Sequence, residues 1–183
     1  NMKSIIEGER ALCFWLSQQT EVSLNHPDEK TRQEASDYVS LMTPVVKSLF
    51  TDLAMEITSD AMQIHGGYGY TKDQGIEQLY RDNRITPIYE GTNSVQASDL
   101  VFRKLSNKNG NIINKFLDQV KSECKTDNEK IKPFLSEFNK NLDTLKKFSD
   151  WMTDKAKTEK DDVSAGANDL SLIHISEPTR PLH

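Results

Sequence analysis

Apolar residues recur every three to four positions along most of the chain, which is the spacing of one face of an α-helix. Segments with this spacing cover residues 2–24, 29–64, 75–83, 93–104, 112–124 and 131–152. The two longest are separated by a turn, and Asp28 stands where a helix N-cap is expected. The pattern therefore predicts an all-α protein.

Residues 29–64 carry the widest apolar stripe of the chain. A stripe this wide needs partners on more than one side of the helix. Pro44 lies inside it and is expected to kink it. The stripe is made of Ala35, Tyr38, Val39, Met42, Val45, Val46, Leu49, Phe50, Leu53, Ile57 and Ile64.

A glycine-rich turn follows the long helix, and a carboxylate in a tight loop follows the turn. Gly66 and Gly67 have no Cβ, so the backbone there can approach a partner closely. After the short helix 75–83, Ile88 and Tyr89 lead directly into Glu90. The arrangement places one carboxylate between an apolar approach and the start of a new helix.

The neighbours of Glu90 suggest a chemical role for it. Next to Ile88 and Tyr89 its carboxylate is expected to be partly desolvated, and desolvation raises the pKa of a carboxyl group. A Glu with a raised pKa is a better general base near neutral pH. The residues alone favour the alternative, a surface Glu in a turn, because Gly-Gly followed by aromatic residues is also an ordinary helix stop.

Composition limits the classes of function. The chain has 183 residues, 28 acidic against 23 basic, and a net charge of -5, which argues against a nucleic-acid surface. No apolar run is long enough to span a bilayer. Cys13 and Cys124 fall on apolar helical faces, which favours buried free thiols in a reducing compartment. No metal site is predicted, and we expect a cytoplasmic protein.

Three stretches, in this order and spacing, resemble a known family: QIHGGYGY at 63–70, LYRD at 79–82 and IYEGTN at 88–93. They are similar to the C-terminal helical domain of acyl-CoA dehydrogenases, flavoenzymes of fatty acid metabolism that oxidise the α–β bond of acyl-CoA thioesters. EGERAL at 7–12, LMTPVVK at 41–47 and ITPIYEGTN at 85–93 resemble one branch more specifically. That branch has a C-terminal helical extension and includes the 3-methylthiopropanoyl-CoA dehydrogenases.

The resemblance implies roles for individual residues. Glu90 would be the catalytic base and Gly91 would lie near the substrate thioester. The residues implied to contact FAD are Gln63, Ile64, His65, Gly66, Gly67, Thr92, Asn93 and Ser94. Ser94 is smaller than the Gln or Glu often found there. For His65, an interaction with the helix dipole competes with the flavin contact. For Arg81 and Arg84, a local ion-pair network competes with a CoA contact.

The resemblance also implies how the chain is divided. Residues 1–105 would be an N-terminally truncated acyl-CoA dehydrogenase C-terminal domain, and 106–169 a truncated helical extension. The stretch LSLIHISEPTR at 170–180 resembles the translation of a transposase-based sequencing adapter, so residues 170–183 are expected to be a non-native tail. The predicted fold is an incomplete antiparallel helix bundle with a helical extension.

The predicted function is that of part of an FAD-dependent acyl-CoA dehydrogenase. Glu90 would abstract the α-proton of an acyl-CoA while hydride passes to the flavin, and an electron-transfer flavoprotein would be the acceptor. The complete protein would be a homo-oligomer, and the fragment alone would be inactive. The alternatives are an acyl-CoA oxidase, which passes electrons to oxygen, and a catalytically idle helical interaction module.

Overall fold

The computed structural model describes the backbone of residues 1–105, 111–124 and 128–173, with side chains described up to residue 167. Every regular element in these ranges is a helix, which confirms the all-α prediction. No helix among them is long and apolar enough to cross a membrane. The chain divides into two compact units, Asn1–Gln96 and the residues from Ala97 onward.

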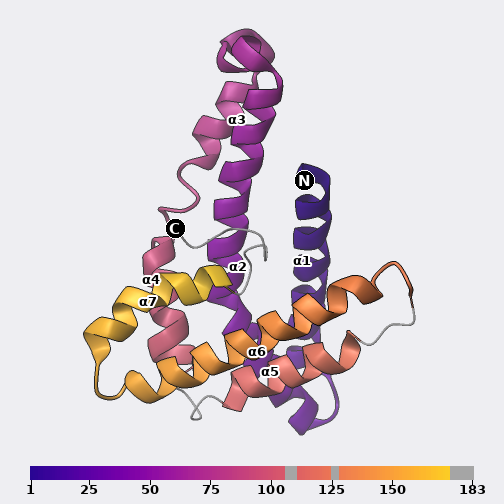
Figure 1. Cartoon of the computed structure of the whole chain (residues 1–183), viewed down its shortest axis with the longest axis vertical. Coiled ribbons are helices and arrows are strands. Elements are labelled where there is room, and N and C mark those ends of the chain that lie inside the picture. Colours follow the sequence, from indigo (N-terminus) through magenta and orange to yellow (C-terminus); the bar gives the residue numbers. More distant parts are fainter. Residues whose placement is uncertain (106–110, 125–127, 174–183) are drawn as a thin grey trace. The chain divides into compact units, whose positions relative to one another are not determined.

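The first unit is built on two long helices, α1 (Met2–Asn25) and α2 (Glu29–Ile64). They run antiparallel and pack side by side (Figure 1). Asp28 caps α2 as predicted, because its Oδ2 accepts a hydrogen bond of 2.8 Å from the Thr31 backbone N–H. The side chain and backbone of Thr31 also hold the pKa of the Asp28 carboxyl below its ordinary value. The helix continues on both sides of Pro44, which is buried.

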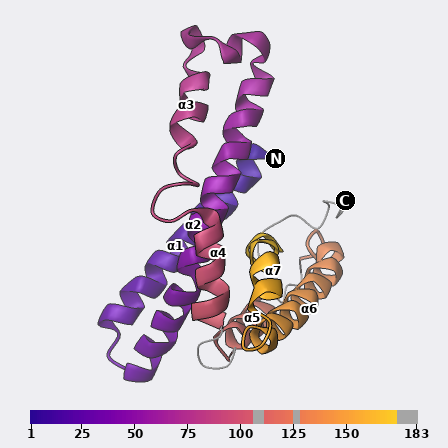
Figure 2. The ribbon, with the colours of Figure 1, turned by 90° about the vertical axis from the view of Figure 1, so that its left-hand side faces the viewer.

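Two short helical turns, η1 (Gly66–Tyr70) and η2 (Lys72–Gln74), lead from α2 into α3 (Ile76–Asn83). Helix α3 returns along α2 in the opposite direction (Figure 2). A loop then leads into α4 (Asn93–Asp99), within which the first unit ends. The antiparallel arrangement of the predicted bundle is therefore present within this unit.

Helix α1 has no buried residue, which corrects one prediction about the cysteines. Cys13 is exposed rather than buried, and Cys124 is half-buried. Among the described elements α1 packs against α2 alone, so one side of it is covered and its remaining apolar residues stay in contact with solvent. Phe14 and Leu24 are 69% and 70% exposed.

The second unit is centred on a π-helical segment, η3 (Leu100–Leu105). The sequence predicts an ordinary α-helix up to residue 104, whereas the structure has a wider π-helical turn from Leu100 onward. A π-turn, with its i→i+5 hydrogen bonds, brings residues five apart towards the same face. Leu100 and Leu105 can thereby both turn inwards, and each is 1% exposed.

Three helices surround η3: α5 (Asn111–Glu123), α6 (Lys132–Lys155) and α7 (Lys160–Ile173). Each of them contacts η3, and α6 also contacts the other two. The residues that are at most 1% exposed in this unit are Ala97, Leu100, Val101, Leu105, Ile113, Ser149, Met152 and Val163. The second unit is thus a small helical assembly around an apolar centre.

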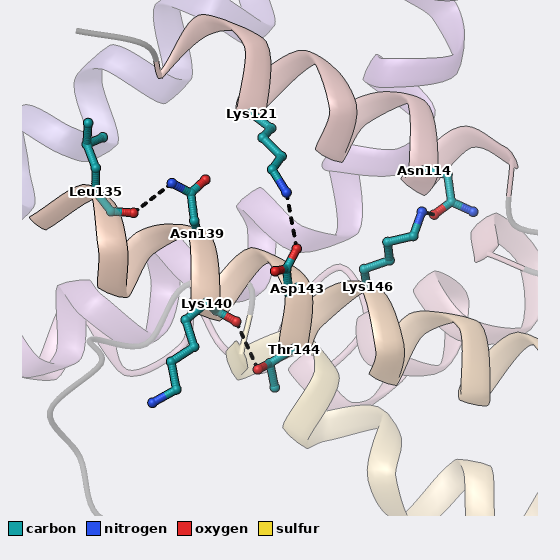
Figure 3. Close-up of polar contacts among 8 residues, drawn as sticks. All are labelled: Asn114, Lys121, Leu135, Asn139, Lys140, Asp143, Thr144 and Lys146. Atoms are coloured by element: carbon teal, nitrogen blue, oxygen red, sulfur yellow. Dashed lines mark hydrogen bonds and ion pairs between the residues drawn. The ribbon is translucent and has the colours of Figure 1, made fainter. Parts of the chain in front are cut away.

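Polar pairs join α5 and α6 at the surface (Figure 3). Lys121 Nζ lies 3.3 Å from Asp143 Oδ1, and Lys146 Nζ donates to Asn114 Oδ1 at 2.8 Å. Both pairs are exposed, and exposed pairs of this kind contribute less than about 1 kcal/mol each. The apolar contacts therefore dominate the stability of this helix pair.

Helix α7 is not predicted by the sequence pattern, because its contact face is made of small residues. Val163 and Ala167 are buried, and a Cβ at Gly166 would lie 2.7 Å from Met152 Cε. The glycine thus permits a close approach between α7 and α6. The helix includes residues 170–173, the first part of the predicted non-native tail, whereas residues 174–183 lie outside the described residues. The origin of the tail stays a prediction.

Candidate active-site loop

The loop between α3 and α4 closes on itself through backbone hydrogen bonds. Ile85 O accepts from the N–H groups of Ile88 and Tyr89 at 2.9 and 3.0 Å. Pro87 O accepts from the Asn93 N–H at 3.2 Å. Glu90 lies within the segment that this last bond closes, so its position depends on the geometry of a short loop.

Glu90 has an unusual backbone conformation. Its φ is +55°, and it is the one residue other than glycine with a positive φ in the described part of the chain. The left-handed region costs an ordinary L-residue about 1–2 kcal/mol. Such a conformation persists when its surroundings determine it, and it is often found at functional sites.

Gly91 continues the left-handed turn with φ +84°. A Cβ on Gly91 would lie 3.2 Å from Gln96 Nε2 and 3.3 Å from Val95 Cγ1. Both the backbone angle and the crowding therefore favour glycine here. Two consecutive residues with positive φ turn the chain sharply just before α4.

Side-chain donors hold the two carbonyl groups of this turn. Gln96 Nε2 donates to Glu90 O at 3.0 Å, and Lys47 Nζ donates to Gly91 O at 2.8 Å. Gln96 stands on α4, next to the loop, whereas Lys47 lies 44 residues before Gly91 on α2. The turn is thus fixed from its own helix and from the long helix of the bundle.

Asn93 ties the loop to the same region of α2. Its Oδ1 accepts from Lys47 Nζ at 2.8 Å, and its Nδ2 donates to Asp52 Oδ1 at 2.7 Å and to Thr51 Oγ1 at 3.1 Å. We refer to Lys47, Thr51, Asp52 and Asn93 as the α2 anchor. These contacts use both polar atoms of the Asn93 side chain.

The anchor affects the ionisation of Asp52. Although much of this residue is exposed, desolvation of its carboxyl raises its pKa above the ordinary value. The hydrogen bond from Asn93 and the charge of Lys47 act in the opposite direction and lower it. Desolvation is the largest of these effects, so the carboxyl group of Asp52 lies in a partly enclosed position.

The residues of α2 that hold the loop were not predicted from the sequence. Four polar side chains interrupt the apolar stripe: Lys47, Ser48, Thr51 and Asp52. They form two pairs four residues apart, and residues four apart lie on the same face of a helix. A polar patch inside an otherwise apolar stripe was the available signal, although it does not say which loop it contacts.

One expectation about Glu90 is wrong for this chain. The sequence predicts a partly desolvated carboxylate, but Glu90 is exposed in the structure. Its apolar neighbours do not cover it, because Ile88 and Tyr89 are themselves 45% and 47% exposed. Ile88 and Tyr89 therefore contribute an exposed apolar surface and do not enclose the carboxylate of Glu90.

The second predicted group, residues 63–67, lies at the opposite end of α3. All five residues are exposed, and a Cβ at Gly66 or Gly67 would meet no atom within 4 Å. Eleven residues of α2 separate Asp52 from Gln63, which is roughly 17 Å along the axis. The structure therefore does not bring residues 63–67 together with the loop at 90–94.

His65 ends α2 and uses one ring nitrogen there. Its Nδ1 lies 2.8 Å from Ala61 O, which requires the proton on Nδ1 if this is a hydrogen bond. The contact supports the helix-end interpretation of that nitrogen. Arg81 forms the predicted local ion pair, with Nε 2.6 Å from Glu77 Oε2, and this bond lowers the pKa of the Glu77 carboxyl.

Comparison with known proteins decides the family. Residues 25–105, which include α2, the loop and α4, match the acyl-CoA dehydrogenase C-terminal domain. The chain belongs to the acyl-CoA dehydrogenase family. The resemblance that the three motifs imply is thereby confirmed, and the bundle of the first unit is that of an acyl-CoA dehydrogenase.

Curated acyl-CoA dehydrogenases show how far the similarity extends. The chain is 38% identical over 123 residues to 3-methylmercaptopropionyl-CoA dehydrogenase of Ruegeria pomeroyi, covering 65% of the chain and 20% of the relative. It is 32% identical over 136 residues to butyryl-CoA dehydrogenase of Syntrophomonas wolfei, covering 74% and 22%. Both matched stretches are longer than residues 1–105, so the similarity reaches the helices after η3.

A solved acyl-CoA dehydrogenase supports the fold. The crystal structure of Caenorhabditis elegans ACDH-11 in complex with C11-CoA matches 91% of the chain and 28% of that protein, with a TM-score of 0.74 and 26% identity. Against the two curated relatives, the chain spans about a fifth of their length.

Proposed function

We propose that this chain is part of an FAD-dependent enzyme that dehydrogenates an acyl-CoA thioester between its α and β carbons. Glu90 is the general base that removes the α-proton, and Gly91 lies against the thioester. The complete enzyme acts in fatty acid metabolism as a cytoplasmic homo-oligomer and passes its electrons to an electron-transfer flavoprotein. The support is the family membership of residues 25–105 together with the geometry of the loop.

The left-handed conformation of Glu90 is the single observation that carries this proposal. An ordinary surface Glu in a turn has no need of a positive φ, yet Glu90 adopts +55° within a turn held by Lys47 and Gln96. Strain held in place by surrounding contacts indicates that the direction of the side chain matters. A general base needs such control, since it must come within hydrogen-bond reach of the proton it removes.

The chemistry requires only one proton acceptor from this chain. The thioester carbonyl makes the α-proton acidic, and a carboxylate oxygen of Glu90 takes that proton. The apolar surface of Ile88 and Tyr89 lies next to the carboxylate and would exclude water once an acyl chain covers it. FAD, when bound, supplies the hydride acceptor for the β-carbon.

The residues proposed to hold FAD fit that group in part. Gln63 to Gly67 present an exposed end of α2 with open space at both glycines, which leaves the backbone accessible. Thr92 and Ser94 are exposed beside Glu90. Asn93 differs, because its side chain and its N–H are engaged within the chain. We therefore assign Asn93 a supporting role and keep the other seven residues as proposed contacts.

Anaerobic mixing of the complete enzyme with acyl-CoA of several chain lengths tests the proposal. Loss of the oxidised flavin absorbance in a single turnover is the expected result. Slow reoxidation in air, together with fast reoxidation by an electron-transfer flavoprotein, would separate a dehydrogenase from an oxidase. A protein that contains flavin and shows no reduction with any acyl-CoA would contradict the proposal and favour the idle interaction module.

A further inference from the structure

We propose that Lys47 and Asn93 are positioning residues, which set the direction of the Glu90 side chain by fixing the loop to α2. The inference rests on the proposed function of Glu90. Neither residue is placed near the reacting atoms. Both act through the backbone of the turn between Glu90 and α4.

Two hydrogen bonds hold the peptide planes on either side of Gly91. Glu90 O belongs to the plane before Gly91 and accepts from Gln96 Nε2 at 3.0 Å. Gly91 O belongs to the plane after it and accepts from Lys47 Nζ at 2.8 Å. When two successive planes are held, the dihedral angles of the residue between them are fixed. Glycine is the residue with the widest freedom, so these two bonds remove the main source of movement beside Glu90.

Lys47 connects the loop to α2 through two hydrogen bonds. Its ammonium group is part-buried and donates to two neutral oxygens, Gly91 O and Asn93 Oδ1, both at 2.8 Å. A charged donor makes shorter and stronger hydrogen bonds than a neutral one. Lys47 therefore joins a loop carbonyl and the first residue of α4 to the same point of the long helix.

Asn93 completes the connection between the loop and α2. Its amide group donates to Asp52 Oδ1 at 2.7 Å and to Thr51 Oγ1 at 3.1 Å, one turn further along α2 than Lys47. The side chain of Asn93 thus contacts residues in two successive turns of α2. Its backbone N–H donates to Pro87 O and closes the loop. The start of α4 cannot shift along α2 without breaking several of these bonds.

The anchor explains how Glu90 keeps a left-handed backbone while its side chain stays exposed. Packing does not hold the carboxylate, so the backbone must define its direction. Removal of Lys47 or Asn93 should leave the helices intact and allow the turn to relax towards negative φ at Glu90. Small misplacements of a reacting group are costly, with losses on the order of a hundredfold for about 1 Å.

The enzymatic test uses Lys47→Met in the complete enzyme, with Lys30→Met as the matched control. Lys30 is an exposed lysine of the same helix with no part in the anchor. The limiting rate of flavin reduction should fall about tenfold to a hundredfold with Lys47→Met, a larger change than that of the acyl-CoA concentration at half-saturation. Lys47→Arg should recover part of the rate. An unchanged rate, or an equal loss with Lys30→Met, would overturn the inference.

A second measurement on residues 1–183 separates this inference from the proposed function. Backbone chemical shifts of Glu90 and Gly91, which depend on φ, should move in Lys47→Met and Asn93→Ala while the helical circular dichroism is retained. If either variant fails to fold, the other one decides. Unchanged shifts would overturn the positioning role even if Glu90 is the base. Moved shifts together with full activity of Glu90→Gln would instead contradict the proposed function.

Discussion

The two compact units of the chain use different means to fix their structures. In the second unit, three helices surround Leu100, Leu105 and Ile113, and the polar pairs lie at the surface. In the first unit, α1 has no buried residue, and the loop before α4 is fixed by hydrogen bonds to Lys47 and Asn93. An apolar centre therefore holds the second unit, whereas polar contacts between residues far apart in the sequence hold the loop of the first unit.

The largest loss of stability is expected from a substitution in the centre of the second unit. Ile113→Ala removes a side chain that is 0% exposed and should lower the free energy of unfolding by about 2–5 kcal/mol. Phe14→Ala, on α1, removes one that is 69% exposed and should change it by less than about 0.5 kcal/mol. Urea denaturation of residues 1–183 gives both values. Equal losses would show that Phe14 on α1 is packed as closely as Ile113 in the second unit.

Gly91→Ala is expected to have the next largest effect. Its φ of +84° is strained for any other residue, and distances of 3.2 and 3.3 Å make a tight fit for a methyl group, so the loop should lose about 1–2 kcal/mol of stability. Gly8→Ala is the control, because Gly8 lies in α1 with nothing within 4 Å of its Cβ position. That change should stabilise the chain by up to about 1 kcal/mol. Thermal unfolding of the two variants should therefore shift in opposite directions.

A smaller effect is expected from the pH dependence of the α2 anchor. Desolvation raises the pKa of the Asp52 carboxyl above 3.8. A raised pKa means that the folded state binds the proton more tightly than the unfolded state does. The contribution of Asp52 to stability is thus complete below pH 3.8 and is lost as pH rises through the raised pKa. Asp52→Asn should remove this component from a pH series of unfolding curves, and an unchanged series would contradict the enclosure of the carboxyl.

The smallest effect is expected at the N-cap of α2, where the sign is reversed. Hydrogen bonds from Thr31 lower the pKa of Asp28 below 3.8. The contribution of Asp28 is therefore present above pH 3.8 and is lost as pH falls through the lowered pKa. Asp28→Asn keeps a capping side chain and removes the charge. The variant should lose part of the acid sensitivity that the unmodified chain shows in thermal unfolding below pH 4, and full retention would show that the cap does not titrate.

Local patterns predicted most of the fold because they act within a few residues. The bounds of α2 and its cap at Asp28 follow from apolar spacing and from one hydrogen-bonding side chain. The π-turn at η3 and the helix α7 were missed, since each depends on contacts made in the folded second unit. The exposure of Cys13 was missed for the same reason, because spacing does not tell how many partners a helix has.

The motif of the candidate site can be found in the sequence, whereas the residues that support its loop cannot. Glu90 and Gly91 stand together in the sequence, and their motif is specific. Lys47 lies 44 residues before Gly91, and no local rule links the two. The exposure of Glu90 could not be predicted from its sequence neighbours either. Ile88 and Tyr89 are themselves exposed, so they do not shield the carboxylate from water.

Single-turnover flavin reduction by Glu90→Gln in the complete enzyme tests the central claim most directly. Gln keeps the shape of the side chain and removes its basicity, so FAD and acyl-CoA should bind normally. The reduction rate should fall by at least about a hundredfold, since general-base contributions run roughly 10²–10⁴. Glu90→Asp should keep part of the rate, with its carboxylate about one bond too short. Near-normal reduction by Glu90→Gln would show that the base lies elsewhere and that Glu90 is an ordinary loop residue.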